Sequence, residues 1–166
     1  MDVANNQRME QLFNDIREIP ISTKRREKLA ELVEYIQHKR NSNQEINLHF
    51  ICTHNSRRSQ FAQLWAKVAA HYYSIPAQCY SGGVEVTEFN QRAVDTLRSQ
   101  GFQIQSEGTK NPVYSVTYSE SEAPLHMFSK LYNDEVNHCE YFAAVMTCSD
   151  ADKNCPIISG TASKIQ

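Results

Sequence analysis

The stretch from residue 46 to residue 72 has the pattern of a β-strand, a short loop and an α-helix in succession. Apolar Ile46, Leu48 and Phe50 alternate with polar residues, which is typical of a strand with one buried face. After the loop, apolar residues recur at helical spacing: Phe61, Leu64, Trp65, Val68, Ala69 and Tyr72. We therefore expect the loop, residues 52–59, at the N-terminus of a helix that follows a strand.

This loop carries the side chains needed to hold an oxyanion and attack it. Free N–H groups and the positive end of the helix dipole favour anions at a helix N-terminus, and a thiol such as Cys52 ionises more readily there. Arg58 offers a planar guanidinium that can hold two oxygens of a tetrahedral oxyanion. Ser59 can donate a hydrogen bond to the thiolate, and Asn55 can fix the loop through side-chain bonds to the backbone. The loop is thus predicted to bind an oxyanion beside a Cys52 nucleophile.

The chain as a whole excludes several classes of protein. At 166 residues it is long enough for one domain with a sizeable core and too short for two of ordinary size. A formal charge of −2 and a pI near 6.3 give no bulk attraction for nucleic acid or an anionic membrane. No apolar signal segment begins the chain, and no apolar run approaches a membrane span. We expect a soluble cytoplasmic protein with no nucleic-acid or membrane partner.

Residues 1–45 are predicted to form a helical extension to a domain at residues 46–166. Five apolar residues share a helical face before Pro20 ends that helix: Met9, Leu12, Phe13, Ile16 and Ile19. A second apolar stripe follows a cap at Ser22 or Thr23: Leu29, Leu32, Val33 and Ile36. The simplest arrangement is a helical hairpin that covers part of the core, and a partner-binding or dimerising arm is the alternative.

The rest of the chain alternates strand and helix patterns. Strand patterns occur at residues 78–81 and 141–147, with room for a short strand at 113–118. Helices are expected at residues 90–101, capped by Asn90, and briefly at 128–136. Strands that alternate with helices favour a wound parallel α/β sheet, in which the working loops lie at the carboxyl ends of the strands.

A second group of candidates follows the strand at 141–147. If the strands before Cys52 and Cys148 are neighbours, their thiols open onto the same face, and Cys155 is close enough in sequence to reach Cys148. That arrangement invites thiol–disulfide exchange. The five cysteines, an odd number at scattered positions, do not resemble a secreted disulfide framework. Two of them, Cys79 and Cys139, are expected to be structural.

Metal sites are disfavoured around the same segment. Asp150, Asp152 and Asn154 mimic the start of a calcium loop, but Cys155 stands where that loop needs glycine and Thr161 where it needs glutamate. A zinc site would need more cysteines or histidines paired at ligand spacing. We therefore expect neither a metal nor a cofactor.

These motifs carry a family resemblance. The pattern Cys52-x-x-Asn55-x-x-Arg58-Ser59 resembles the phosphate-binding loop of the low-molecular-weight protein tyrosine phosphatase superfamily, and residues 50–53 with Gln60 are most similar to its thioredoxin-coupled arsenate reductase branch. Residues 148–156 are similar to the segment that carries the two redox cysteines of those reductases. Tyr80-Ser81-Gly82-Gly83 resembles the second strand and turn of the family.

The resemblance implies a three-layer wound α/β fold with a four-stranded parallel sheet, and a relay of three cysteines. Cys52 would attack arsenate, Cys148 would attack the Cys52 adduct and release arsenite, and Cys155 would then attack Cys148, leaving a disulfide for thioredoxin to reduce. The implied oxyanion-binding residues are Thr53, His54, Asn55, Ser56, Arg57 and Arg58. Phosphotyrosine-protein phosphatase chemistry through a phosphocysteine is the second interpretation, because phosphate and arsenate share shape and charge.

Three departures from the family pattern stand out. His54 occupies a position that is usually glycine, and Arg57 stands where many relatives have a second loop cysteine. The general acid of the family, an aspartate before a proline downstream of the cysteine pair, has no counterpart, because no Asp-Pro pair occurs. Residues 46–166 are therefore expected to lack the C-terminal acid loop and last helix. An inactive oxyanion-binding or regulatory module is the third interpretation.

Overall fold

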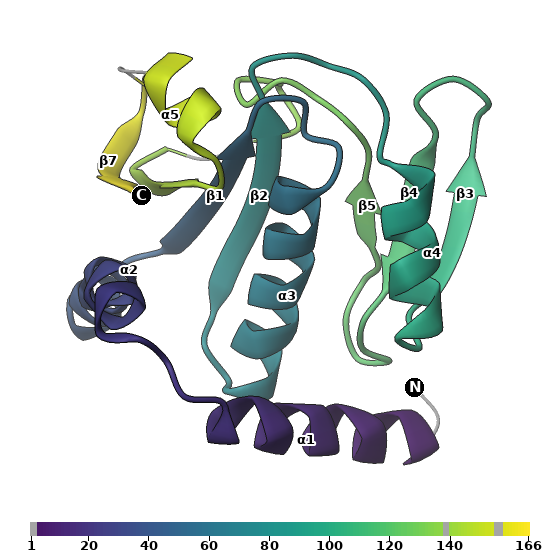
Figure 1. Cartoon of the computed structure of the whole chain (residues 1–166), viewed down its shortest axis with the longest axis horizontal. Helices are drawn as coiled ribbons and strands as arrows, with labels where there is room; N and C mark the ends of the chain where they lie inside the picture. The colour runs from purple at the N-terminus through teal and green to yellow at the C-terminus, as the bar shows by residue number, and fades with distance from the viewer. Residues whose placement is uncertain (1–2, 138–139, 155–157) are drawn as a thin grey trace.

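The computed structural model describes residues 3–137, 140–154 and 158–166, and its centre is a four-stranded parallel sheet in the order β2-β1-β6-β7 (Figure 1). The strands are β1 (Ile46–Cys52), β2 (Ala77–Gly83), β6 (Phe142–Met146) and β7 (Thr161–Ile165). The predicted parallel α/β sheet is therefore confirmed. Since β1 pairs with β6, the two cysteine-bearing strand ends lie side by side.

Helices cover one face of this sheet, and a shorter helix with a long connection covers the other. The first face packs on α2 (Thr23–Asn41) and α3 (Arg58–Tyr72) through apolar side chains that include Leu48, Phe50 and Tyr35. On the opposite face, Ile51 and Ala144 pack with α5 (Ser149–Asn154) and the connection that precedes β6. The layers of the predicted three-layer fold are thus present.

A second, antiparallel sheet packs beyond α3 and was predicted only in part. It has the order β3-β4-β5, and only a short strand at 113–118 was expected. The elements are β3 (Gln103–Glu107), β4 (Val113–Thr117), β5 (Leu125–Met127) and α4 (Gln91–Ser99). Val116 and Met127 pack with Leu64 of α3 and Leu97 of α4. The helix α3 is therefore buried between the two sheets.

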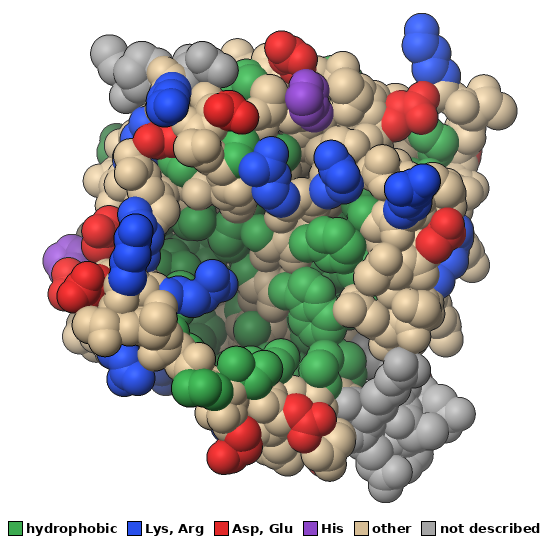
Figure 2. Space-filling view, viewed as in Figure 1, with side chains coloured by type: hydrophobic (Ala, Val, Ile, Leu, Met, Phe, Trp, Pro, Cys, Tyr) green, Lys and Arg blue, Asp and Glu red, His purple; other side chains and the backbone are tan. Residues whose placement is uncertain are grey.

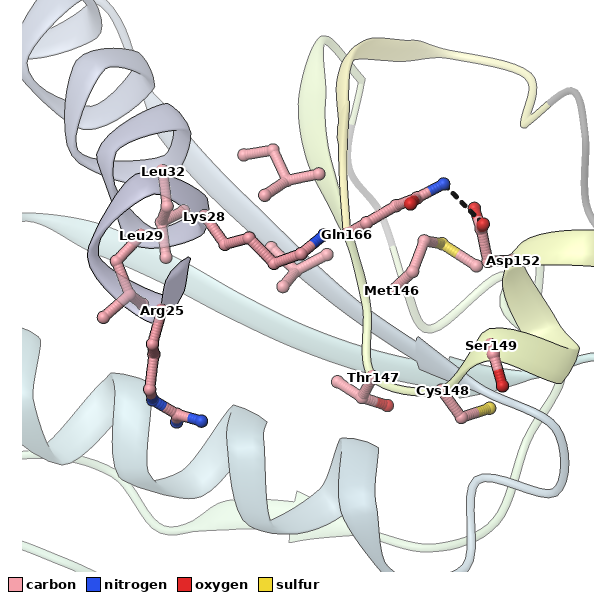
Figure 3. A pocket seen from close by; sticks show the side chains of 12 residues that line it. Arg25, Lys28, Leu29, Leu32, Met146, Thr147, Cys148, Ser149, Asp152 and Gln166 are labelled. Atoms are coloured by element: carbon pink, nitrogen blue, oxygen red, sulfur yellow. Dashed lines mark hydrogen bonds between the residues drawn. The ribbon is translucent and has the colours of Figure 1, made fainter. Parts of the chain in front are cut away.

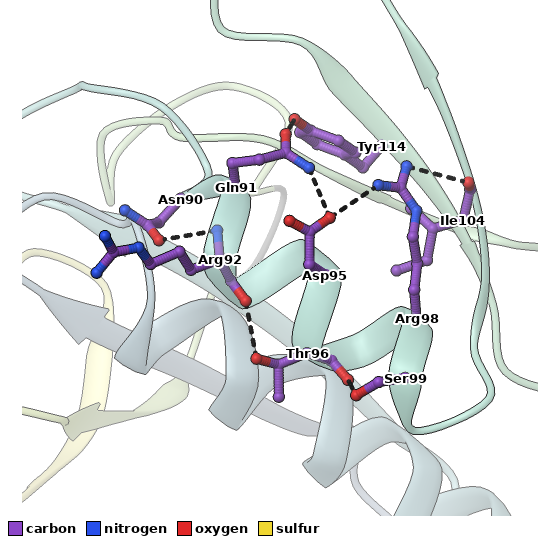
Figure 4. A network of polar contacts seen from close by, with 9 residues as sticks. All are labelled: Asn90, Gln91, Arg92, Asp95, Thr96, Arg98, Ser99, Ile104 and Tyr114. Carbon is purple, nitrogen blue, oxygen red and sulfur yellow. Dashed lines mark hydrogen bonds and ion pairs between the residues drawn. The ribbon is translucent and has the colours of Figure 1, made fainter.

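Polar contacts fasten α4 to the small sheet (Figure 4). Asn90 caps the helix as predicted, because its side chain accepts a hydrogen bond from the Arg92 N–H. The Arg98 guanidinium pairs with Asp95 and reaches the carbonyl oxygen of Ile104 in β3. The Tyr114 hydroxyl of β4 donates to Gln91.

The two N-terminal helices form, but they diverge instead of packing as a hairpin (Figure 1). Met9 and Phe13 of α1 (Val3–Glu18) belong to the apolar cluster of α3, α4 and the small sheet. Tyr35 of α2 belongs to the cluster on the parallel sheet. Each helix therefore buries its apolar face against a different part of the molecule, which draws the two apart.

The brief helix expected at residues 128–136 is wrong. The backbone of this segment bonds across to β2, because Lys130 accepts a hydrogen bond from the Gly83 N–H and the Tyr132 N–H donates to the Gly83 carbonyl. These partners leave fewer backbone groups for a helical ladder. Among the helices that the structure describes, none combines the length and the apolar character needed to cross a bilayer.

Candidate active site

The predicted oxyanion loop joins the end of β1 to the start of α3. Cys52 is the last residue of β1 and Arg58 is the first residue of α3, so the loop lies at a helix N-terminus as expected. Cys148 follows β6, the neighbour of β1. The Thr53 hydroxyl contacts the Cys148 sulfur at 3.5 Å. The two thiol groups therefore open at the same edge of the sheet.

The Cys52 sulfur lies among hydrogen-bond partners. The N–H of Asn55 donates to it at 3.2 Å, and the Ser59 hydroxyl oxygen is 3.0 Å away. The Asn55 side-chain amide donates to that same hydroxyl oxygen at 2.8 Å. Because Asn55 already supplies a hydrogen to the Ser59 oxygen, the hydroxyl is left to donate its own hydrogen to a Cys52 thiolate.

Asn55 shapes the loop. Its φ is +45°, a left-handed conformation that asparagine adopts more readily than most residues. The side chain is fully buried, and its oxygen accepts hydrogen bonds from the Gln60 side chain at 3.2 Å and from the Lys130 N–H at 3.0 Å. The sequence predicted that the Asn55 side chain would fix the loop by bonding the loop backbone. The side chain instead bonds Ser59, Gln60 and the N–H of Lys130.

The outer side of the loop is exposed. His54 lies 3.2 Å from Glu85 and is not among the residues with positive φ, so its position imposes no requirement for glycine. The Ser56 hydroxyl donates to the carbonyl oxygen of Glu88 at 2.6 Å. Arg57 and Arg58 both have exposed side chains. An incoming oxyanion can therefore reach both guanidinium groups from solvent.

Sequence patterns revealed only some of the residues that support this loop from outside it. Ser129 donates to the His54 carbonyl at 2.8 Å, and Gln60 links the Asn55 and Phe128 carbonyls. A methyl group on Gly83 would lie 2.7 Å from the Asn55 backbone nitrogen. A glycine is therefore required for this close approach of β2 to the loop. Gln60 and the Gly82-Gly83 pair gave a signal in the sequence as parts of the family resemblance, and Ser129 gave none.

Two basic side chains, those of Lys130 and His49, are buried. Lys130 is 3% exposed, and its amine lies 4.7 Å from the centre of the Phe128 ring. Burial lowers the pKa of Lys130 to about 8, against the opposing charge of Asp134. Burial, with a smaller contribution from the Lys130 charge, lowers the pKa of His49 to about 3, so that His49 is neutral at physiological pH.

Cys148 differs from the structural Cys79. Partial burial raises the pKa of Cys148, but hydrogen bonds from Thr53 and the Ala151 N–H, with the Arg58 charge, outweigh burial and hold that pKa below its ordinary value. Burial raises the pKa of Cys79 to about 12. Cys79 lies in the core, as predicted. The predicted third relay cysteine, Cys155, lies outside the described residues, as does Cys139.

Comparison with known proteins finds arsenate reductases among the relatives of this chain. No family model matches the sequence. Arsenate reductase 2 of Staphylococcus epidermidis is 32% identical over 117 residues, which cover 70% of this chain and 71% of that protein. Arsenate reductase 2 of Staphylococcus haemolyticus matches to the same extent. An arsenate reductase of Staphylococcus aureus is 29% identical over 118 residues, with the same coverage.

A solved structure is also similar, that of a thioredoxin-dependent arsenate reductase from Corynebacterium glutamicum. The TM-score is 0.42 and the identity 18%, and the match covers 82% of this chain and 56% of that one. The staphylococcal relatives carry the assignment, because one third of the aligned residues are identical over more than two thirds of both chains. The protein belongs to the arsenate reductase family of enzymes.

Proposed function

We propose that the protein reduces arsenate to arsenite with Cys52 as nucleophile and Cys148 as resolving thiol. The observation that carries this proposal is the adjacency of the two strand ends. β1 and β6 are paired in parallel, and the Thr53 hydroxyl after Cys52 contacts the Cys148 sulfur. A thiol beside the nucleophile is what a reductase needs and what hydrolysis of a phosphate ester does not.

The oxyanion would be held at the N-terminus of α3. Loop N–H groups and the helix dipole favour an anion there, and the Arg58 guanidinium suits two oxygens of a tetrahedral ligand. Ser59 and the Asn55 N–H stabilise the Cys52 thiolate. Phosphate fits the same description, so arsenate specificity comes from the redox step and not from the loop.

The relay balances two electrons. Cys52 sulfur bonds to arsenic and one arsenate oxygen leaves as water after protonation. The Cys148 thiolate then attacks the Cys52 sulfur, the S–As bond breaks, and its electron pair stays on arsenic, which departs as arsenite. Cys155 would next attack Cys148 and free Cys52, and thioredoxin would reduce the Cys148–Cys155 disulfide by ordinary exchange. This chemistry requires a reducing compartment such as the cytoplasm.

Arsenate-driven oxidation of thioredoxin tests the proposal. The Cys148→Ser variant should lose turnover while it still binds arsenate, whereas Cys79→Ala, which changes a buried core cysteine, should keep most of the activity. Full arsenate turnover by Cys148→Ser would refute the relay. Aryl phosphate hydrolysis that survives Cys148→Ser, without arsenate turnover in the parent protein, would identify a phosphatase. Tight phosphate binding with neither activity would identify a binding module.

A further inference from the structure

The turn between β3 and β4 of the small antiparallel sheet is bonded to the segment that supports the oxyanion loop. Asn111 lies in this turn and makes two hydrogen bonds to the backbone of Ser129. Its side-chain amide donates to the Ser129 carbonyl at 2.7 Å, and its side-chain oxygen accepts from the Ser129 N–H at 3.1 Å. The Asn111 side chain therefore fixes both backbone groups of Ser129 at once.

Ser129 connects this turn to the oxyanion loop. Its side chain is buried, and its hydroxyl donates to the His54 carbonyl at 2.8 Å and accepts from the Thr87 N–H at 2.9 Å. Because the hydroxyl hydrogen and a lone pair both have partners, the hydroxyl is held in one orientation. A continuous path of hydrogen bonds thus runs from Asn111 in the small sheet to the His54 carbonyl in the loop.

The His54 carbonyl belongs to the peptide unit that ends in the Asn55 N–H. In a trans peptide unit the C=O and N–H bonds point in opposite directions. The carbonyl of this unit points outward to Ser129, and its N–H points inward and donates to the Cys52 sulfur at 3.2 Å. The contact that holds the carbonyl therefore also aims a hydrogen-bond donor at the nucleophile.

This peptide unit is held differently from its neighbours in the loop. The carbonyls of Thr53 and Ser56 accept hydrogen bonds from main-chain N–H groups of the segment between β2 and α4. The His54 carbonyl accepts from two hydroxyl groups, those of Ser129 at 2.8 Å and Thr87 at 3.3 Å. Its orientation therefore depends on side chains, and chiefly on Ser129, whose hydrogen bond is the shorter.

We propose that Asn111 is a positioning residue for the nucleophile. Through Ser129 it fixes the His54–Asn55 peptide unit in the orientation that directs the Asn55 N–H at the Cys52 sulfur. A donor held in this way favours the Cys52 thiolate and needs no reorganisation when the thiolate forms. The inference rests on the nucleophile of the proposed function and not on the later relay steps. The small antiparallel sheet is thus a working part of the active site.

The other thiol of the site lies outside this path. Cys148 lies beside Thr147 and Ser149 in the lining of a groove between α2 and the carboxyl ends of β6 and β7 (Figure 3). Its sulfur contacts the Thr53 hydroxyl at 3.5 Å and accepts from the Ala151 N–H at 3.4 Å. Because neither contact belongs to the path from the small sheet, Cys148 is an internal control in the same protein.

Alkylation of Cys52 at fixed neutral pH measures the effect of Asn111. Lys and Arg side chains gather on the face that carries α3 and α4 and would concentrate an anionic reagent, so uncharged iodoacetamide is used (Figure 2). Asn111→Gly removes the side chain, and glycine readily adopts the φ of +46° found there. We expect the Cys52 rate, quantified by peptide mass spectrometry, to fall on the order of 10-fold, the lower end of what a hydrogen bond to a charged group contributes. The Cys148 rate should not change.

Ser129→Ala tests whether Asn111 acts through Ser129. This variant removes the hydroxyl that holds the His54 carbonyl and should slow Cys52 at least as much as Asn111→Gly does. The double variant Asn111→Gly/Ser129→Ala should be no slower than Ser129→Ala alone, because two residues on one path are not additive. Rate losses that multiply in the double variant would overturn the inference.

Val116→Ala separates positioning from stability. Val116 is fully buried in β4 of the same sheet, so alanine loosens the sheet without removing a contact of Asn111. Urea unfolding, followed by the fluorescence of Trp65, measures the stability of each variant. Val116→Ala should be less stable than the parent and keep its Cys52 rate. The inference is wrong if Val116→Ala slows Cys52 as much as Asn111→Gly does, or if Asn111→Gly leaves the Cys52 rate unchanged or slows Cys148 equally.

Arsenate-driven oxidation of thioredoxin is measured on the same parent protein. A parent that shows the expected pattern of Cys52 alkylation but reduces no arsenate would refute the proposed function and leave the positioning role of Asn111 standing. A parent that reduces arsenate, with an Asn111→Gly variant whose Cys52 is alkylated as fast as in the parent, would refute the positioning role alone.

Discussion

Replacing Asn55 with alanine should weaken the fold and the nucleophile together. The side chain is fully buried, donates to Ser59 at 2.8 Å and accepts from the Lys130 N–H at 3.0 Å. Alanine removes both interactions and keeps a backbone whose φ is +45°. Gln60, which also bonds the Asn55 oxygen, retains the Asn55 and Phe128 carbonyls as partners, so Lys130 is the donor that is orphaned.

The magnitude follows from these two lost interactions and from the backbone conformation that alanine must keep. An orphaned buried N–H costs about 1–3 kcal/mol, and the lost bond to Ser59 about 0.5–1.5 kcal/mol. The left-handed backbone costs an alanine about 1 kcal/mol more. Together the free energy of unfolding should fall by about 3–5 kcal/mol. Asn43→Ala is the matched control, since Asn43 has φ of +51° but an exposed side chain. It should cost only the backbone contribution of about 1 kcal/mol.

Urea unfolding followed by the fluorescence of the single tryptophan, Trp65 in α3, measures both variants. Alkylation of Cys52 by iodoacetamide at fixed pH reports the nucleophile, and it should slow in Asn55→Ala because the Ser59 hydroxyl is no longer oriented toward the sulfur. If Asn55→Ala loses no more stability than Asn43→Ala, and alkylation is unchanged, the account of the loop is refuted.

Three further predictions follow from buried groups. Because the pKa of His49 is lowered to about 3, the folded state binds fewer protons than the unfolded state below pH 6.5. The free energy of unfolding should therefore fall by about 2–3 kcal/mol when the pH is lowered from 7 to 4.5. His49→Phe should remove most of this loss, as measured by urea unfolding. The pKa of Lys130 is about 8 in the folded protein and 10.5 in the unfolded chain, so unfolding takes up a proton between pH 8 and pH 10.5. Burying the charged amine is unfavourable at pH 7, and Lys130→Met should therefore raise the free energy of unfolding by about 2–3 kcal/mol at that pH. The gain should shrink above pH 8 in the same assay, because the parent amine then loses its charge. Gly83→Ala should displace the oxyanion loop, with a loss of about 1–3 kcal/mol and weaker phosphate binding by calorimetry, because the new methyl group would lie 2.7 Å from the Asn55 nitrogen and the Thr53 oxygen. The argument on His49 is contradicted if the parent protein has the same free energy of unfolding at pH 7 and pH 4.5. The argument on Lys130 is contradicted if Lys130→Met is less stable than the parent, and the argument on Gly83 if Gly83→Ala binds phosphate with unchanged affinity.

The sequence predicted the strongly patterned parts of the fold. β1 and β6 are rich in apolar residues, and the caps at Ser22 and Asn90 are local signals that the structure confirms. The edge strand β7 was missed, because Thr161–Ile165 has mostly small and polar residues and gains its strand form by pairing with β6. Pairing between distant segments carries no local signal of this kind.

The same distinction holds for the site. Cys52, Asn55 and Ser59 were found because they are close in sequence and their chemistry is local. Ser129 and Lys130 were missed, since they act mainly through backbone groups and hydroxyl contacts brought to the loop from far along the chain. Lys130 even lies where a helix was expected.

The measurement that tests the central claim most directly is the trapping of the first disulfide. Reduced Cys155→Ser protein is treated with one equivalent of arsenate, quenched in acid and digested, and peptides joined through cysteine are identified by mass spectrometry. The account predicts a peptide pair linked through Cys52 and Cys148, formed with arsenate and absent with phosphate, in step with arsenite release. Arsenite released while Cys52 and Cys148 both remain free thiols would contradict it.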